Sequence, residues 1–228
     1  MIAGIHQLHY LPWLRYIEKM ARCDVFIVLD NIQYNKNGWQ NRNRIKTANG
    51  PLLLTVPVHA RLGDTLDQVA INNAVPWRKK HRASIEQAYR HAPFFDAYWP
   101  PLAAVYEHEW AMLNDLNRAM IDWYVRALGI GSRIVYASEL NALGTATERL
   151  INLMKAVDGT RYYSGAYALE QYLDAEALAA AGIGLVIQEW RAPEYPQLHG
   201  PFVRDLSILD MMFHCGPDTL SIILEKRS

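Results

Sequence analysis

The first thirty residues combine two apolar runs with one amphipathic stretch. Residues 2–7 form a short apolar segment that ends in His-Gln, and residues 25–29 (Val-Phe-Ile-Val-Leu) are rich in β-branched side chains. Between them, apolar residues recur every three or four positions from Leu11 to Arg22, which is the period of a helix with one buried face. Strand, helix and strand in this order predict a βαβ unit, whose two strands are parallel.

Three further apolar segments predict strands in the second half of the chain, at residues 134–137, 161–163 and 185–190. Thr145 precedes an amphipathic segment and is followed three positions later by Glu148, which is the pattern of a helix capping box. With the first unit, these segments predict a three-layer α/β fold around a mainly parallel sheet of about five strands. We expect residues 1–228 to form a single domain.

The sequence between the two halves of the predicted sheet predicts two further elements, a helical insert and a β-hairpin. Residues 76–127 have a helical pattern and predict an insert of two or three helices, with breaks at Ala92-Pro93 and at Pro100-Pro101. Residues 52–58 predict a strand that pairs with residues 42–46 across the turn at 49–51, which makes a small β-hairpin. Pro57 places the end of that strand at an edge or beyond the ladder.

Charge and cysteine content narrow the class of protein. Lys and Arg number 23, as do Asp and Glu, so no net charge recruits nucleic acid or a membrane surface. The two cysteines, Cys23 and Cys215, stand in apolar surroundings and are expected to be core residues in a reducing compartment. The chain has neither a signal-peptide pattern nor an uncharged apolar run of the ~18 residues that a membrane span needs. We therefore expect a cytoplasmic protein with neither membrane nor nucleic acid as a partner.

Polar residues collect where the predicted strands end. In a parallel α/β sheet, ligands bind in the crevice outside the carboxyl ends of the strands. We expect this crevice to collect His6, Gln7, Asp30, Ser138, Glu139 and Ser164.

The first candidate motif runs from His6 to Trp13 (His-Gln-Leu-His-Tyr-Leu-Pro-Trp). A strand that ends in His-Gln and turns into a proline-started helix aims backbone N–H groups and imidazoles at one place, which suits a phosphate or a carboxylate. In the alternative interpretation, His6 is hydrogen-bonded inside the sheet, and Tyr10 and Trp13 pack as core. The motif His-x-x-His has no third ligand nearby, so we predict no metal site.

The second candidate motif is the polar stretch from Asp30 to Lys46. Alternation along a strand places Asn41 and Asn43 with Trp39 on one face, and Gln40 with two arginines, Arg42 and Arg44, on the other. Amides offer donors and acceptors, and Arg offers a planar fork, so this stretch is suited to a sugar or a nucleotide. The alternative is a solvated hairpin whose amides cap turns.

Later segments add further candidates. Ser164-Gly165 at a strand end predicts an anion site at a helix start, or simply an N-cap. Tyr195 and Gln197 lie in a predicted loop, and Asp210 is either part of a cap that begins at Ser207 or a carboxylate turned into the site. The basic run at 78–82 is interpreted as a solvated helix face, with an auxiliary phosphate contact as the alternative. The chain lacks the glycine-rich dinucleotide and P-loop patterns and the Gly-x-Ser-x-Gly elbow.

Several of these motifs together resemble the WbqC-like protein family. The resemblance rests on His6-Gln7-x-x-Tyr10-Leu11-Pro12-Trp13, Asp24-Val25-Phe26, Leu29-Asp30-x-x-Gln33-Tyr34, Trp39 to Lys46, Leu54 to Val58, Tyr163-Ser164-Gly165, Tyr195-x-Gln197 and Leu206 to Asp210. Two departures are His9 where the family has Asn, and Ala-Tyr-Ala after Gly165 where the family has further glycines. The resemblance implies a bacterial enzyme from gene clusters for surface polysaccharides or related products, some of whose members are suggested to transfer glycine.

From the residues and the resemblance we expect a transferase that acts on an activated sugar or a related intermediate, with an aminoacyl group such as glycine passing to an amine. His6 or His9 would be the general base, and Gln7, Asn41 or the amides at 11–13 would stabilise the oxyanion. The residues expected to be catalytic are His6, Gln7, His9 and Asp30. Those expected to bind substrate are Tyr10, Trp13, Gln33, Tyr34, Trp39, Gln40, Asn41, Arg42, Asn43, Arg44, Lys46, Ser164, Gly165, Tyr195, Gln197 and Asp210.

Two alternatives stay open. The βαβ start and the histidine turn also suit a nucleotidyltransferase-like or adenylate-forming enzyme, which would use ATP and Mg²⁺. A non-catalytic partner protein that binds a sugar nucleotide would need the same residue types. The sequence assigns no cofactor, donor, acceptor or oligomeric state, and an aminoacyl-tRNA stays open as the donor.

Overall fold

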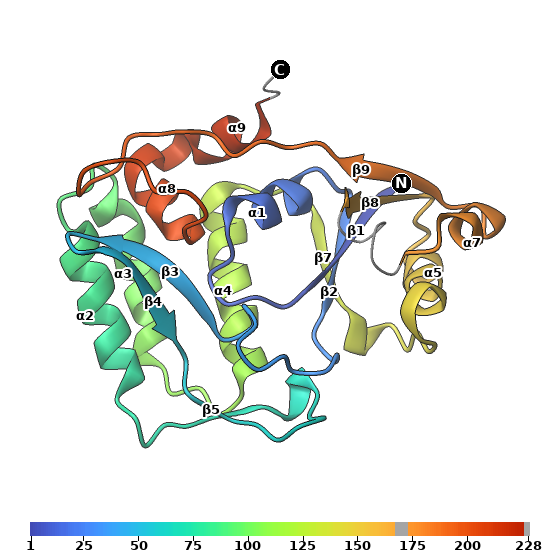
Figure 1. Cartoon of the computed structure of the whole chain (residues 1–228), viewed down its shortest axis with the longest axis horizontal. Helices are drawn as coiled ribbons and strands as arrows, with labels where there is room; N and C mark the ends of the chain where they lie inside the picture. The colour runs from blue at the N-terminus through green and yellow to red at the C-terminus, as the bar shows by residue number, and fades with distance from the viewer. Residues whose placement is uncertain (167–172, 226–228) are drawn as a thin grey trace.

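The computed structural model describes residues 1–166 and 173–225 (Figure 1). Its central sheet has five parallel strands in the order β7-β2-β1-β8-β9, so the predicted α/β fold is confirmed. The strands are β1 (Ile2–Gln7), β2 (Val25–Leu29), β7 (Arg133–Tyr136), β8 (Arg161–Gly165) and β9 (Gly184–Gln188). β1, the first strand in the chain, therefore lies in the middle of the sheet.

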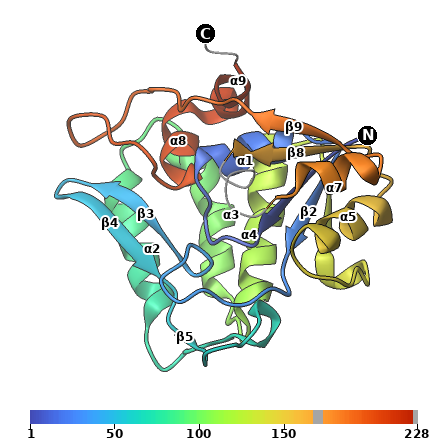
Figure 2. The ribbon, with the colours of Figure 1, turned by 45° about the vertical axis from the view of Figure 1, so that its right-hand side comes forward.

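Helices cover both faces of this sheet, as Figure 2 shows. On one face, α1 (Leu14–Ala21) and α4 (Leu113–Leu128) pack against Phe26 and Val28 of β2. On the other face, α5 (Ala146–Ala156) and α7 (Ala175–Ala180) pack against Ile5 and Ile27. Because alternate side chains of a strand point to opposite faces, each strand supplies both apolar layers. The predicted three-layer arrangement is confirmed.

The start of α1 differs from the prediction of a helix that begins at Pro12. Leu11 has a φ of 46°, and Trp13 is extended, so the helix begins only at Leu14. The Pro12 carbonyl accepts a hydrogen bond from the Ile208 amide (2.8 Å), and Trp13 forms a bridge with Ser207. Residues 11–13 thus pair with the C-terminal part of the chain, which prevents them from forming the first helical turn.

The helical insert consists of α2 (Trp77–Tyr89), α3 (Phe95–Glu107) and α4. The predicted break at Ala92-Pro93 is confirmed, because it lies between α2 and α3. The break at Pro100-Pro101 is wrong, because both prolines lie inside α3. Each proline removes one helix hydrogen bond, but α3 buries Phe95, Leu102 and Tyr106 against the core, and this packing holds the helix together.

The capping box at Thr145 is also wrong. The Thr145 side chain makes no cap hydrogen bond with any described residue, because Ala146, the first residue of α5, has a φ of 45°. A φ of 45° at the first helical residue departs from the helical backbone on which side-chain capping depends.

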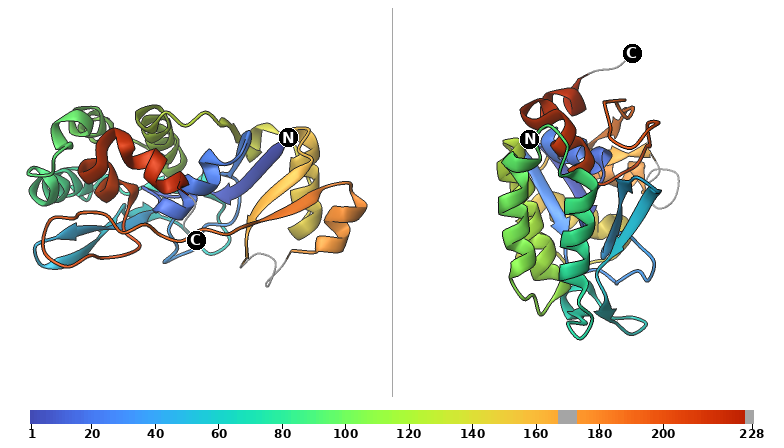
Figure 3. Two further views of the ribbon diagram at one scale, coloured as in Figure 1. Left: turned by 90° about the horizontal axis from the view of Figure 1, so that it is seen from above. Right: turned by 90° about the vertical axis from the view of Figure 1, so that its left-hand side faces the viewer.

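The hairpin of β3 (Arg42–Thr47) and β4 (Gly50–Thr55) is confirmed as antiparallel, and Pro57 lies beyond its ladder. A second small pair, β5 (Val58–His59) and β6 (Ala70–Ile71), follows. The chain ends in α8 (Ile208–Cys215) and α9 (Thr219–Leu224), and short 3₁₀ turns occur at η1 (Leu66–Gln68), η2 (Ala137–Glu139) and η3 (Gly216–Asp218). The hairpin and the segment before α8 run along the same side of the molecule (Figure 3). None of the helices in the described ranges is long and apolar enough to cross a membrane.

Candidate functional site

The sheet opens between its two halves at the carboxyl end of β1. β1 pairs with β2 as far as Gln7 and Leu29, whereas among the described residues it pairs with β8 only from Ile2 to Gly4. From β1 the chain order proceeds to β2 and β7 on one side and to β8 and β9 on the other. The point at which strand order reverses is where open α/β sheets bind ligands. The gap between β1 and β8 is therefore the position at which this fold is expected to bind a ligand.

Two histidines lie at this position. The His6 and His9 ring centroids are 4.8 Å apart, and His6 also contacts the Tyr16 ring at 4.7 Å. His6 Nδ1 is 3.2 Å from the Gln7 carbonyl oxygen, which only accepts, so a neutral His6 carries its proton on Nδ1 and a lone pair on Nε2. Burial lowers the pKa of His6 well below its usual value, and the nearby His9 and Lys19 lower it further. His6 is therefore a neutral base at pH 7.

His9 is 5% exposed, and its Nδ1 has no hydrogen-bond partner among the described residues. Burial lowers the pKa of His9 to about 3, so this ring is also neutral at pH 7. A buried nitrogen without a partner is uncommon in folded proteins, and a ligand group is one way to satisfy it. Beside it, the Trp13 and Trp39 rings meet edge to face at 4.9 Å, and the Arg44 guanidinium lies 5.7 Å from the Trp39 ring centroid.

Gln7 is exposed, and Gln40 sets its orientation. Gln40, 1% exposed, accepts a hydrogen bond from the Asn35 amide through Oε1 (2.7 Å) and donates from Nε2 to Gln7 Oε1 (3.3 Å). Because the Asn35 amide can only donate, the Gln40 side chain has one allowed orientation, and this fixes Gln7 as well. The Gln7 amide nitrogen is thus presented as a donor at the end of β1.

Asp30 lies at the end of β2, but its oxygens are already engaged. They accept hydrogen bonds from the Ser138 amide (3.0 Å), from the Ser138 hydroxyl (2.7 Å) and from Arg118, which also pairs with Glu139 (3.1 Å). The Arg118 guanidinium covers the Tyr136 ring at 3.7 Å. Asp30 therefore joins the ends of β2 and β7 through η2, and this geometry favours a positioning role over the catalytic role expected from the sequence.

The polar stretch from Asp30 to Lys46 separates into two groups. Asn41 donates to the Val56 carbonyl (2.8 Å), and Asn43 donates to the Leu11 carbonyl (2.6 Å). Both buried side-chain amides are therefore used to fix the backbone of neighbouring segments. Arg42 closes the turn before it by donating to Gly38 (3.1 Å) and Asn37. The predicted alternation holds within β3, where Asn43 is buried and Arg42 and Arg44 are half-buried. It does not extend to Trp39 and Gln40, because β3 begins at Arg42. In the preceding loop, Gln33 is exposed and Tyr34 is half-buried.

The candidates from the C-terminal half form a separate polar cluster with Lys46, at the hairpin. Lys46 Nζ donates to Gln197 Oε1 (3.2 Å) and to the carbonyls of Gly200 (3.1 Å) and Pro201 (2.6 Å). Asp210, 0% exposed, accepts from the Tyr89 hydroxyl (2.8 Å), and burial raises the pKa of Asp210. In the described ranges, no hydrogen bond or ring contact joins these side chains to His6 or His9.

Mainly internal contacts are also found for Tyr10, Tyr195 and Ser164. The Tyr10 hydroxyl is buried and contacts His81 Nδ1 (2.9 Å) and the Tyr106 hydroxyl, and Tyr195 packs its ring on Phe202 at 5.4 Å. Ser164 is fully buried beside the gap, and Gly165 follows it. The helix start expected after Gly165 lies partly outside the described residues, which exclude 167–172.

The chain matches the sequence profile of the WbqC-like protein family over residues 7–222. It belongs to the WbqC-like protein family. The predicted membership is confirmed, and the match includes Gln7, His9 and the Trp39–Lys46 stretch, whereas His6 lies one residue before it. This WbqC-like protein is also 33% identical over 223 residues to Uncharacterized protein Rv1507c of Mycobacterium tuberculosis (strain ATCC 25618 / H37Rv), with 94% of each chain covered.

Lys19 is a further candidate site residue of the WbqC-like protein, which sequence reasoning missed. It is 5% exposed, and Nζ donates to the Ile5 carbonyl (2.7 Å) in β1. Burial lowers the pKa of Lys19 to about 8. A signal was available, since Lys19 follows Tyr16 by three helical positions and therefore shares the helix face that contacts His6.

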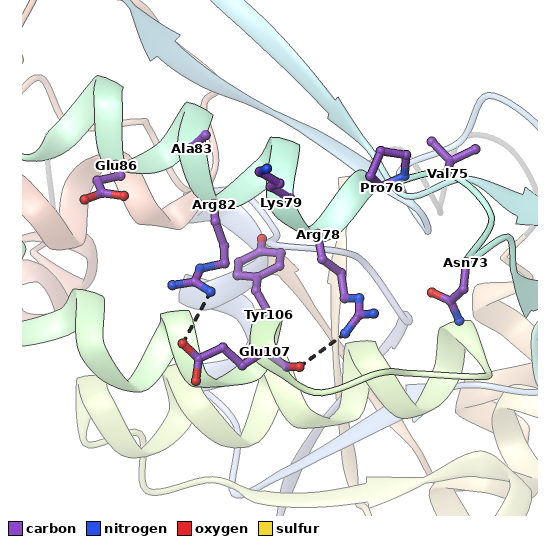
Figure 4. A pocket seen from close by; sticks show the side chains of 10 residues that line it. All are labelled: Asn73, Val75, Pro76, Arg78, Lys79, Arg82, Ala83, Glu86, Tyr106 and Glu107. Carbon is purple, nitrogen blue, oxygen red and sulfur yellow. Dashed lines mark hydrogen bonds and ion pairs between the residues drawn. The ribbon is translucent and has the colours of Figure 1, made fainter.

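A groove of about 620 Å³ lies between α2 and α3 (Figure 4). Its rim carries Arg78, which pairs with Glu109 (2.9 Å), and Arg82, which pairs with Glu107 (3.3 Å). These pairs supply internal counter-charges, which favours a solvated helix face over a phosphate contact for the basic run. In the described part of the chain, His, Cys, Asp and Glu side chains do not gather in a group of three or more that could hold a metal ion.

Proposed function

We propose that this WbqC-like protein is a transferase that moves an acyl group, such as glycyl, to the amino group of an activated sugar or a related intermediate in bacterial surface-glycan or small-molecule biosynthesis. The observation that carries the proposal is the neutral His6 ring, which keeps a lone pair on Nε2 and lies 4.8 Å, centroid to centroid, from the His9 ring, whose Nδ1 has no partner among the described residues. An amine must lose a proton when it attacks an acyl carbon, and a neutral imidazole accepts one.

The transfer uses groups that are close together in the sequence. The amine nitrogen forms a bond to the acyl carbon, and its proton passes to His6 Nε2. The acyl oxygen gains negative charge, which the Gln7 amide nitrogen can stabilise by donation because Gln40 holds it in that orientation. When the bond to the leaving group breaks, the leaving atom takes the proton from His6. The products are an amide and the free carrier.

The walls of the site support a ring-bearing acceptor. Trp13 and Trp39 are both half-buried and present indole surface beside His9, and Arg44 lies over Trp39. Indole faces pack against sugar or base rings, and Arg pairs with phosphate or carboxylate. This combination fits an activated sugar better than a small free amine.

The test is a transfer assay with defined partners. Donors are a glycyl thioester and glycyl-tRNA, acceptors are amino-sugar nucleotides, and mass spectrometry detects the gain of one glycyl group. We expect His6→Asn to reduce the rate by roughly 10²–10⁴-fold, which is the range for loss of a general base. The matched control is His59→Asn, because His59 is exposed on β5, and it should keep the wild-type rate.

Other outcomes would contradict the proposal. Pyrophosphate release that requires ATP would indicate the adenylate-forming alternative, and acceptor binding in calorimetry without turnover would indicate a binding partner. A His6→Asn variant as active as His59→Asn would remove His6 as the base.

A further inference from the structure

Lys19 reaches from α1 into the gap between β1 and β8. The last β1–β8 pair is Gly4 with Tyr163, so the next carbonyl along β1, that of Ile5, lies just beyond the ladder. Lys19 Nζ donates to this carbonyl at 2.7 Å. An ammonium group therefore occupies the opening of the sheet, at the level of His6.

Among the described residues, this ammonium group has no carboxylate within ion-pair distance. No ion pair in the described ranges includes Lys19, although Glu18 precedes it in the sequence. The Glu18 carboxylate is engaged by the Tyr163 hydroxyl (3.0 and 3.1 Å), by Gln188 and by Arg22. Lys19 instead has the Ile5 carbonyl and the Tyr162 ring, whose centroid is 5.6 Å from Nζ.

A buried cation of this kind is costly unless an anion compensates it. Removing an ammonium group from water is energetically costly. A hydrogen bond to one carbonyl offsets only part of this desolvation cost. The negative charge of Glu18 raises the pKa of Lys19 through space, but burial is the larger effect and lowers it overall. Among the other described groups around Lys19, neither His6 nor Cys23 adds a negative charge at pH 7. His6 is neutral, and burial raises the pKa of the Cys23 thiol to about 12, so this group is uncharged too. At pH 7 the ammonium group is therefore mostly charged, and no anion contacts it among the described residues.

We infer that Lys19 binds an anionic group of the substrate, a carboxylate or a phosphoryl oxygen, in the gap between β1 and β8. An ammonium group has three donors, and the Ile5 carbonyl uses one of them. An anion held there would fix the substrate beside His6. The inference rests on the proposed use of this edge as the substrate site, but it does not depend on which reaction follows.

The first test measures anion binding without turnover, with sulfate and acetate as probes in NMR titrations. Sulfate stands for a phosphoryl group and keeps one charge state from pH 6 to 9. We expect wild-type protein to bind at least one probe and Lys19→Gln to bind it about tenfold more weakly, because a charge-assisted hydrogen bond is lost. Tighter binding of sulfate or of acetate supports the inference and identifies the class of anion. The control Lys79→Gln changes an exposed lysine of α2 and should bind like wild type.

A second test needs only the wild-type chain, so it holds even if Lys19→Gln fails to fold. Burial lowers the pKa of Lys19 to about 8, so its charge is lost between pH 7 and 9. Sulfate affinity should fall several-fold over this range. Constant affinity from pH 7 to 9, or equal binding by a folded Lys19→Gln variant, would overturn the inference. Anion binding that persists when every transfer assay fails would remove the acyl-transfer proposal and leave Lys19 as an anion-binding residue.

Discussion

Two buried lysines of this protein have opposite surroundings. Lys46, in the hairpin, has three oxygen acceptors around its ammonium group, from Gln197, Gly200 and Pro201. Lys19, at the opening of the sheet, has one carbonyl. Both residues are at most 5% exposed. The difference therefore lies in how fully the fold itself satisfies each charge.

The same contrast extends to their neighbours. Around Lys46, the polar side chains of Tyr89, Gln197 and Ser207 are used to hold the hairpin, the loop and α8 together. Asp210, near Lys46, leaves Oδ1 without a hydrogen-bond partner among the described residues but accepts from Tyr89 through Oδ2. Near Lys19, the described residues form no hydrogen bond with the His9 side chain, and its Nδ1 is buried without a partner. A polar side chain that is hydrogen-bonded within the fold serves as a structural joint, and one that is not has capacity left for a ligand.

The largest effect expected from this comparison is on stability. Lys46→Met should lower the free energy of unfolding by about 3 kcal/mol, because it removes three hydrogen bonds worth roughly 1 kcal/mol each, to Gln197 and to the carbonyls of Gly200 and Pro201. Urea denaturation measures this loss, and Lys79→Met, at an exposed position, serves as the matched control. If Lys46→Met unfolds at the wild-type urea concentration, the hairpin cluster is not a structural joint and the contrast with Lys19 fails.

A smaller effect is expected on the pH dependence of stability, through the buried His9 ring. Its pKa is about 3 in the folded chain and about 6.5 when unfolded, so the unfolded state binds the proton more tightly and stability is lost as pH falls below 6.5. At pH 5 this loss amounts to about 2 kcal/mol. His9→Asn should therefore lose about 2 kcal/mol less than wild type between pH 7 and pH 5, in thermal or urea unfolding. Parallel pH profiles for the two proteins would show that His9 is not buried as a neutral ring.

The smallest effect compares helix caps in the two regions. Ser207 accepts from the Leu209 amide (3.3 Å) at the start of α8, whereas the Thr145 side chain caps nothing among the described residues. Ser207→Ala should cost about 1 kcal/mol, and Thr145→Ala should cost nearly nothing. Thermal unfolding of the two variants side by side measures the difference. Equal costs would mean that the cap at Ser207 contributes nothing beyond its position.

The parallel sheet was predictable because its determinants are local. Apolar runs such as Val25–Leu29, separated by helical periods, indicate parallel strands without any knowledge of distant contacts. The same rule placed His6 and Gln7 at a strand end, where the structure has them. The three errors in the helices, at Pro12, at Pro100-Pro101 and at Thr145, arose where packing, backbone angles or pairing with a distant segment outweighed a local signal.

The division of the polar residues between structure and site was not predictable, because it depends on partners far away in the sequence. Lys46 Nζ and Gln197 Oε1 are 3.2 Å apart in the fold, but neither sequence segment contains a signal that predicts this contact. Asn41 and Asn43 have side chains suited to a ligand. In the fold, however, their amide groups donate to the backbone carbonyls of Val56 and Leu11. Lys19 was missed for the converse reason, since a lysine on a short helix is usually a solvated residue.

The position of β1 in the middle of the sheet has a consequence for synthesis of the chain. Among the described strands, β1 is synthesised first, and β2 can cover one of its edges soon afterwards. Its other edge stays unpaired until β8, which begins at Arg161, has been synthesised. Until then the nascent protein carries an open strand edge, which is a template for pairing with other chains, and contacts this far apart in sequence form slowly. A chain terminated before Arg161 keeps that edge exposed, and aggregation of such fragments follows from the order of the strands.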